Sequence, residues 1–219
     1  MNLLKEIILL VRKETLLELR MNYAISGVLL YVFSTIFIVY VAFVRLEPTL
    51  WHTLFWIITL FASVNAIVKS FIQENSSRQL YYYSLVNPLA ILFAKIIYNI
   101  LLLLLLSMLC WAGLGLVGGN PVKDIGQFLL AIFLAATGFA ITFTFIAAIA
   151  AKADNSATLM AVLSFPLVIP ILMTLIKISA NALRLLQDTS VMQDVWTLVG
   201  IDLLLLAAAL LLYPFLWRD

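Results

Sequence analysis

The chain has 219 residues, of which 65% are hydrophobic and only 11% are charged. A soluble domain is about half apolar and about a quarter charged, so this composition excludes a water-soluble fold and predicts an integral membrane protein in a lipid bilayer. The formal net charge of +2 gives no reason to expect a nucleic-acid partner, and the single cysteine, Cys110, excludes an intramolecular disulfide and a multi-thiolate metal site.

Residues 1–22 predict an amphipathic helix in the inner membrane interface, and not a cleavable signal peptide, because they are rich in charge. At about 100° per residue, one face of this helix is basic and the other is apolar. The basic face contains Lys5, Arg12, Lys13 and Arg20. Glu14 and Glu18 fall on the apolar face. Two interpretations stay open: acids that reach out of the lipid interface, or acids that contact a partner protein together with Arg20.

Six apolar runs follow, each about as long as the roughly 20 residues that cross a bilayer core. They predict transmembrane helices at residues 23–44, 51–72, 96–117, 125–151, 158–176 and 195–217. The second run contains Lys69, and the sixth contains Asp202. We therefore expect an all-α integral membrane protein that forms a single membrane domain over residues 1–219.

The basic residues predict that both termini are cytoplasmic, because Lys and Arg are enriched in inner loops. In that orientation nine of the 13 basic residues lie on the inner side and four on the outer side. The inner residues are Lys5, Arg12, Lys13, Arg20, Lys69, Arg78, Lys95, Lys152 and Arg218, and the outer residues are Arg45, Lys123, Lys177 and Arg184.

No phosphate-binding loop of the Gly-x-x-x-x-Gly-Lys-Ser/Thr type occurs in the sequence, and His52 is its only histidine. One imidazole cannot supply a histidine metal cluster, and no Ser/His/Asp constellation can be assembled around it. Because His52 stands beside Trp51 at an outer run end, we interpret it as a solvated interfacial group, with a haem or metal ligand as the alternative. We expect no enzymatic activity in this chain. Active transport would need an ATPase on another chain or an ion gradient.

Residues 73–88 form the longest inner loop, polar at its start and then rich in tyrosine. The polar start could cap a short surface helix, and Asn87-Pro88 would end it and start the next element. We expect this segment to be the contact with a cytoplasmic ATPase, with an ordinary loop as the alternative. The residues expected in that contact are Glu74, Asn75, Arg78, Gln79 and Tyr82.

Polar residues and prolines inside the predicted spans are further candidates. Asp202 lies about a turn and a half into the sixth run, and an intramembrane carboxylate suggests a proton or substrate role unless water or a neighbouring donor reaches it. Asn65 and Asn99 are expected to bond across helices. Pro166 and Pro170 each remove an intrahelical hydrogen bond, which predicts either a functional helix break or a static kink.

The stretch 165–172, Phe-Pro-Leu-Val-Ile-Pro-Ile-Leu, resembles the Leu-Pro-Leu-x-Ile-Pro-x-Leu signature of the haem exporter protein B (CcmB) family, and Lys152 precedes it in a short inner loop, as in that family. Two weaker similarities accompany it. Residues 71–95, ending in Ala94-Lys95, resemble the family's cytoplasmic segment, and Glu14 with Arg20 resembles its N-terminal region. This chain has Asn75-Ser76 and Arg78-Gln79 where the family usually has Asp-Gly and Leu-Glu, so the local turn and its charge are expected to differ.

The resemblance implies an ABC-2-like permease, the transmembrane subunit of an ABC-type complex for haem export or delivery in c-type cytochrome biogenesis, in the bacterial inner membrane. The implied partners are a cytoplasmic ABC ATPase that binds ATP, a haem-handling membrane subunit and, indirectly, a periplasmic haem chaperone. Haem would be the cargo of the complex, with no cofactor bound directly by this chain. The alternatives are an ABC-2 permease for a lipid, polysaccharide or drug, a gradient-driven carrier, and a purely structural membrane subunit.

Overall fold

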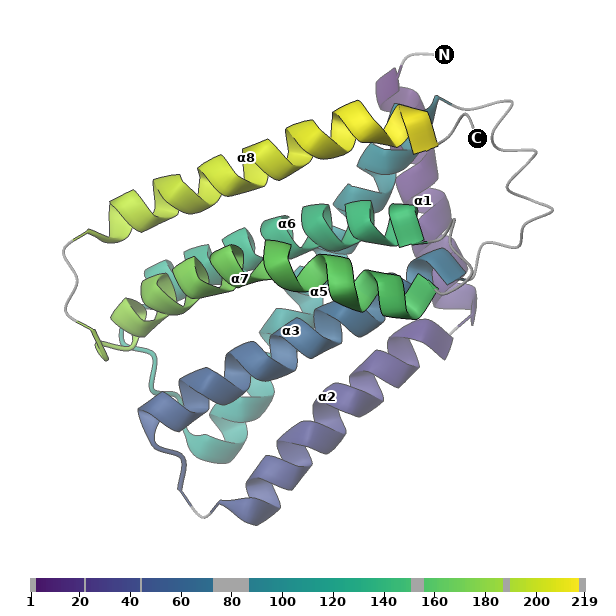
Figure 1. Ribbon diagram of the computed structural model, residues 1–219. Helices are drawn as coiled ribbons and strands as arrows, with labels where there is room; N and C mark the ends of the chain where they lie inside the picture. Colours follow the sequence, from purple (N-terminus) through teal and green to yellow (C-terminus); the bar gives the residue numbers. More distant parts are fainter. Residues whose placement is uncertain are drawn as a thin grey trace.

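The computed structural model describes residues 3–21, 23–43, 45–72, 87–150, 156–186 and 190–216. This part of the chain is all α-helical, as the sequence predicts (Figure 1). Its helices are α1 (Leu3–Met21), α2 (Tyr23–Ala42), α3 (Pro48–Ile72), α5 (Pro88–Gly118), α6 (Ile125–Ala150), α7 (Ser156–Ala182) and α8 (Val191–Leu216).

Five of the described helices contain an apolar stretch long enough to cross a bilayer. These stretches are Pro48–Ile67, Pro88–Gly118, Ile125–Ala150, Val162–Ala182 and Val191–Phe215, and α2 contributes a shorter one, Ser26–Ala42. At 1.5 Å per residue the stretch in α2 is about 25 Å long, against about 30 Å for the hydrocarbon core, a mismatch that local thinning of the bilayer can accommodate. The chain is thus a multi-pass membrane protein, and we retain six spans as a proposal.

The helix after the 73–88 segment starts at Pro88, well before the predicted residue 96. Asn87 caps it, because its side chain accepts a hydrogen bond from the Leu89 backbone nitrogen at 3.0 Å and Pro88 occupies the first turn. The predicted span begins after Lys95 because it was defined as a run without charged residues. In the structure Lys95 is buried inside α5, with 3% of its surface exposed. The expectation that Asn87-Pro88 starts a new element is confirmed.

Helices α7 and α8 also extend beyond the predicted runs, since a charged residue ends an apolar run but need not end a helix. α7 continues past Lys177 to Ala182, and α8 starts at Val191 instead of residue 195. Arg184 closes α7 with a φ of 56°, and the Leu185 nitrogen donates to the Ala180 oxygen at 2.9 Å. The Ala182 oxygen accepts from the Lys123 and Asp124 nitrogens at 3.1 and 3.0 Å, which ties the start of α6 to the end of α7.

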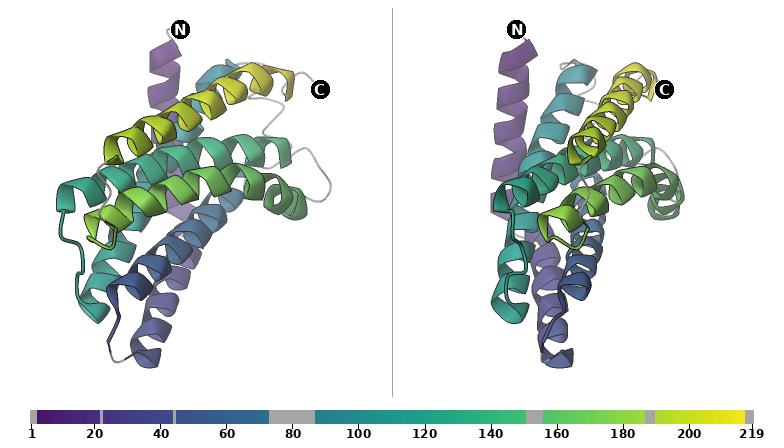
Figure 2. Two further views of the ribbon diagram at one scale, coloured as in Figure 1. Left: turned by 60° about the vertical axis from the view of Figure 1, so that its left-hand side comes forward. Right: turned by 90° about the vertical axis from the view of Figure 1, so that its left-hand side faces the viewer.

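Helix α6 lies at the centre of the bundle, where it packs against α3, α5, α7 and α8. Small residues at several buried positions let neighbouring backbones approach closely, and Phe139 and Phe143 fill the remaining space. The buried alanines and glycine are Ala131, Ala135, Ala136, Gly138, Ala140, Ala147 and Ala150. Figures 1 and 2 show α6, α7 and α8 running side by side, with α5 crossing them at a large angle.

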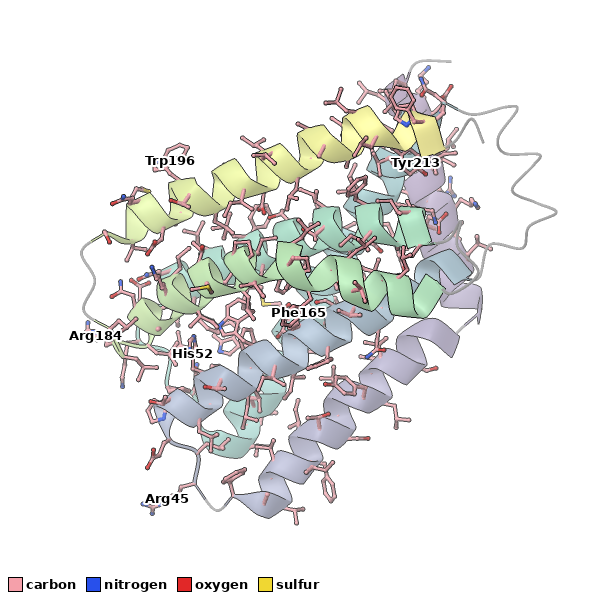
Figure 3. The ribbon with its side chains drawn as sticks, in the orientation of Figure 1. Arg45, His52, Phe165, Arg184, Trp196 and Tyr213 are labelled. Atoms are coloured by element: carbon pink, nitrogen blue, oxygen red, sulfur yellow. The ribbon has the colours of Figure 1, made fainter. Side chains whose placement is uncertain are left out.

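Both ends of the described chain lie at one end of this bundle. Figures 1 and 2 place the start of α1 and the end of α8 there, whereas Figure 3 places Arg45 and Arg184 at the opposite end. From the distribution of basic residues we expect the end that carries the termini to face the cytoplasm.

Candidate functional site

The predicted ATPase contact lies between α3, which ends at Ile72, and α5, which begins at Pro88. Glu74, Asn75, Arg78, Gln79 and Tyr82 fall outside the described residues, so their role stays a prediction. The structure does show that α1 packs against the bundle through α5, with a smaller contact to α2. A force applied between α3 and α5 would therefore reach the N-terminal helix through α5.

A helix is present where one was predicted at the N-terminus, and this helix, α1, packs against α5 and α2. Its place at the membrane interface stays a prediction. Its apolar residues Leu4 and Ile8 are exposed, while Glu14 keeps only 15% of its side-chain surface exposed. A Glu14 carboxylate oxygen lies 3.5 Å from Lys13 Nζ, so the acid has a basic neighbour on its own helix. The side chains of Glu18 and Arg20 fall outside the described residues.

Helix α7 continues without interruption through Pro166 and Pro170. Both prolines are exposed, on the same outward face as Phe165, which Figure 3 labels. Proline lacks a backbone N–H, so the carbonyls of Val162 and Pro166 lose their usual donors four residues later. Any functional deformation at these prolines would thus occur within a continuous helix that presents them outward.

His52 is buried, with 5% of its surface exposed, so its interpretation as a solvated interfacial group is wrong. Its Nε2 lies 2.7 Å from the Oγ of Ser179 on α7 and 3.1 Å from the Nε1 of Trp56. Trp56 Nε1 donates to Ser179 Oγ at 2.8 Å, and that hydroxyl donates to the Leu175 oxygen at 2.6 Å. The cluster joins α3 to α7 and engages the Nε2 that a haem iron would use.

Aromatic rings surround this cluster on the side of α6. Trp51 stacks on Phe55 with ring centroids 5.7 Å apart, and Phe128 of α6 lies 5.1 Å from Phe55. Trp51 and Phe55 are fully buried, so Trp51 is a core residue and not the interfacial anchor that its position at a run end suggests. The outer end of α3 is therefore held inside the bundle.

A second polar contact joins α5 to α6. Asn99 Nδ2 donates to Thr144 Oγ1 at 2.8 Å, and both side chains are fully buried. The expectation of a cross-helix bond is confirmed for Asn99. It is wrong for Asn65, which is exposed and donates to the Phe61 oxygen of its own helix at 2.9 Å.

Asp202 is deeper than the sequence suggests, because α8 begins earlier than the apolar run. It follows Val191 by about 16 Å of helix, near the middle of α8. Asp202 is 7% exposed, its carboxyl group contacts Gly138 near the middle of α6, and its Oδ1 has no hydrogen-bond partner among the described residues. The structure therefore places the predicted intramembrane acid against the α6 backbone at Gly138, a neighbour that no sequence pattern indicated.

One glycine spacing, Gly113-x-Gly115-x-x-Gly118, matches the dinucleotide-binding pattern by sequence alone. It lies in the last turns of α5 and not in a strand-to-helix turn, so the context that the pattern requires is missing. Two of its glycines instead permit close packing. A Cβ at Gly113 would stand 2.6 Å from Ile36 Cδ1, and one at Gly118 would collide with Leu46.

Within the described ranges, no group of three or more His, Cys, Asp or Glu side chains is arranged to hold a metal ion. Among the contacts that the structure makes between distant polar residues are His52 with Ser179 and Asn99 with Thr144, and Asp202 lies against the backbone at Gly138. Sequence reasoning missed Ser179, Thr144 and Gly138, since no periodic pattern relates residues as far apart as 127 positions.

Comparison with known proteins identifies one family over most of the chain. The family model described as ABC-2 type transporter matches residues 3–190, a range that covers α1 to α7. No curated protein and no solved structure matches the chain.

Proposed function

This chain belongs to the ABC-2 type transporter family, and we propose that its complex exports or delivers haem for c-type cytochrome biogenesis. The family makes the chain the permease subunit of an ABC transporter, which works with an ABC ATPase in a lipid bilayer. The haem cargo is supported by one observation: residues 165–172 resemble the haem exporter signature, and they form the middle of α7.

We further propose that the ATPase subunit acts on residues 73–86, which connect α3 directly to α5. Movement of α5 would reach the bundle centre, because Asn99 of α5 bonds to Thr144 of α6 at 2.8 Å. From α6 it would reach α7 and α8, which both pack against it. The side chains between α5, α6, α7 and α8 are buried and closely packed. A closely packed interface has little free volume, so a displacement of one helix moves its neighbours.

The position of His52 supports a model in which a partner subunit binds the haem and this chain does not. In haem proteins the iron is commonly held by a histidine or by a cysteine thiolate. The only imidazole of this chain bonds Ser179 and Trp56 inside the bundle, and its only thiol, Cys110, is buried as well. We therefore propose that this subunit converts ATP hydrolysis in its partner into transfer or release of haem held by a haem-handling membrane subunit, from which a periplasmic chaperone collects it.

The test is affinity purification of the tagged chain from its own membrane in mild detergent, followed by identification of the co-purifying proteins and haem staining. The expected result is an ABC ATPase together with a haem-containing membrane protein, and loss of c-type cytochromes when the gene is deleted. Recovery of an ATPase with normal c-type cytochromes in the deletion strain would retain the permease and exclude the haem cargo.

A further inference from the structure

Asp202 is the only buried acidic side chain among the described residues. Every other described Asp or Glu is at least partly exposed, as expected for charged groups at the ends of spans. A carboxyl group near the middle of a membrane helix is unfavourable when it is ionised, because neither water nor lipid solvates the charge there. The negative charge of Asp202 must therefore be neutralised by a basic side chain, a bound cation or a proton.

No basic partner is available on the helix that Asp202 contacts. Helix α6 has no charged or titratable side chain along its whole length, and Asp202 lies against it at Gly138. Helices α5 and α7 also pack against α8. The titratable groups of these helices are Lys95, Tyr98 and Cys110 on α5, Lys177 on α7, and Asp194 and Tyr213 on α8 itself.

The two lysines lie at other levels of the bundle. Lys95 is near the start of α5, at the end of the bundle where α8 finishes, and Lys177 is exposed near the opposite end of α7. The hydroxyl of Thr137 on α6 lies within hydrogen-bond reach of the Asp202 carboxyl group, and it donates to the Leu134 oxygen at 2.9 Å. Among the described residues, Asp202 Oδ1 has no hydrogen-bond partner.

A metal cation does not fit this contact. A Cβ built on Gly138 would stand 2.7 Å from Asp202 Oδ1 and 3.3 Å from Oδ2, so the carboxyl group already occupies the space beside α6. A hydrated or coordinated cation needs several oxygen ligands around it, whereas a proton on the carboxyl oxygen needs almost no volume. The geometry favours the proton.

We propose that Asp202 is a proton-binding site that holds its proton while α6 and α8 are packed and releases it when they separate. Separation admits water, the carboxyl O–H bond breaks, its electron pair stays on the carboxylate, and water takes the proton. Repacking reverses these steps. Since the separated arrangement is the deprotonated one, a rise in pH favours separation and a fall in pH favours packing.

The proton site itself does not depend on the proposed haem cargo. Only the suggestion that a partner ATPase drives the separation of α6 and α8 rests on the proposed function. The site is therefore tested on the full chain alone, purified and reconstituted in lipid nanodiscs, so a wrong cargo assignment leaves the result unaffected.

The first measurement is infrared spectroscopy of the C=O stretching band of protonated carboxyl groups near neutral pH. The native chain is expected to show such a band, Asp202→Asn to lose it, and the matched control Asp194→Asn to keep it. An unchanged band in Asp202→Asn would overturn the proposal. A band that disappears on addition of Na⁺ at constant pH would overturn it as well, in favour of a cation site.

The second measurement compares Gly138→Ala with Gly200→Ala. A Cβ at Gly138 of α6 meets the carboxyl group, whereas a Cβ at Gly200 of α8 meets nothing within 4 Å. Gly138→Ala is expected to open the contact and move the loss of the band to lower pH, while Gly200→Ala leaves it unchanged. The same titration in both variants would overturn the link to helix packing. If Gly138→Ala does not accumulate, Gly138→Ala combined with Asp202→Ala decides, because removal of the carboxyl group frees the space beside α6: recovery of the protein relative to Gly138→Ala alone is expected, and no recovery contradicts the contact.

Discussion

At the scale of single residues, burial decides what His52 does. Position at a run end suggested a solvated imidazole, but α7 returns to the outer end of α3 and covers it with Ser179. The hydroxyl of Ser179 then bonds three groups within 2.8 Å: His52, Trp56 and the Leu175 oxygen. His52 is thus one member of a buried polar cluster between two helices, which is a structural role.

We predict that His52→Ala destabilises the protein by about 2 kcal/mol without abolishing its function, because it creates a cavity and leaves Ser179 and Trp56 with fewer partners. Thermal unfolding in detergent measures the loss, and haem staining of c-type cytochromes measures the function. Thr53→Ala is the control, since Thr53 is exposed and bonds only the Thr49 oxygen. Complete loss of c-type cytochromes at a normal protein level would show that His52 acts on haem directly.

At the scale of elements, α7 is the described helix that contains two internal prolines. Two prolines four residues apart occur in a helix that nevertheless continues from Ser156 to Ala182. Each proline leaves one backbone carbonyl without its usual donor, which lowers the energy needed to bend the helix at that point. Because α7 packs against both α6 and α8, a bend in α7 would displace these two helices, between which Asp202 lies.

We predict that Pro166→Ala combined with Pro170→Ala impairs transport while the protein still inserts into the membrane. The two alanines restore the missing N–H donors and stiffen α7. The measurement is the amount of c-type cytochrome relative to the amount of membrane-inserted protein. A matched double change to alanine at Ile169 and Met173, on the same exposed face, controls for altered lipid contact. Normal cytochrome levels in the proline variant would show that the two prolines have only a structural role and are not needed for transport.

The segment between α3 and α5 carries a second prediction at this scale. Glu74→Lys and Tyr82→Ala should each reduce co-purification of the ATPase. Glu74 and Arg78 are four residues apart, so on a helix they would form one charged edge. Tyrosines supply much of the binding energy at protein interfaces. Membrane insertion should not change. Glu47→Lys, an exposed acid just before the start of α3 at the other end of the bundle, is the control. Undiminished ATPase recovery in both variants would remove this segment as the coupling site.

At the scale of the whole molecule, the helices form one bundle around α6, and the start of α1 and the end of α8 lie at the same end of it (Figures 1 and 2). The excess of basic residues at that end then predicts that it faces the cytoplasm, where an ATPase can reach it.

We predict that a single cysteine at Ser77 is labelled from the cytoplasmic side and one at Asn120 from the opposite side, both in a Cys110→Ala background. Asn120 is exposed at the end of the bundle away from the termini, so its cysteine should react in intact cells with a reagent that does not cross the inner membrane. Labelling of position 120 only after the cytoplasm is opened would reverse the proposed orientation.

The class of the protein, the approximate helices and the cap at Asn87-Pro88 could be predicted without a structure, because apolar run length and capping chemistry are local properties. The predicted helix ends at Lys95, Lys177 and Asp194 were wrong, since a helix tolerates a charge that an apolar run does not. Only the packing of the helices shows that Asn99 bonds to Thr144 and that Asp202 lies against Gly138. These contacts join distant residues, and their partners are selected by which small side chains let two helices approach.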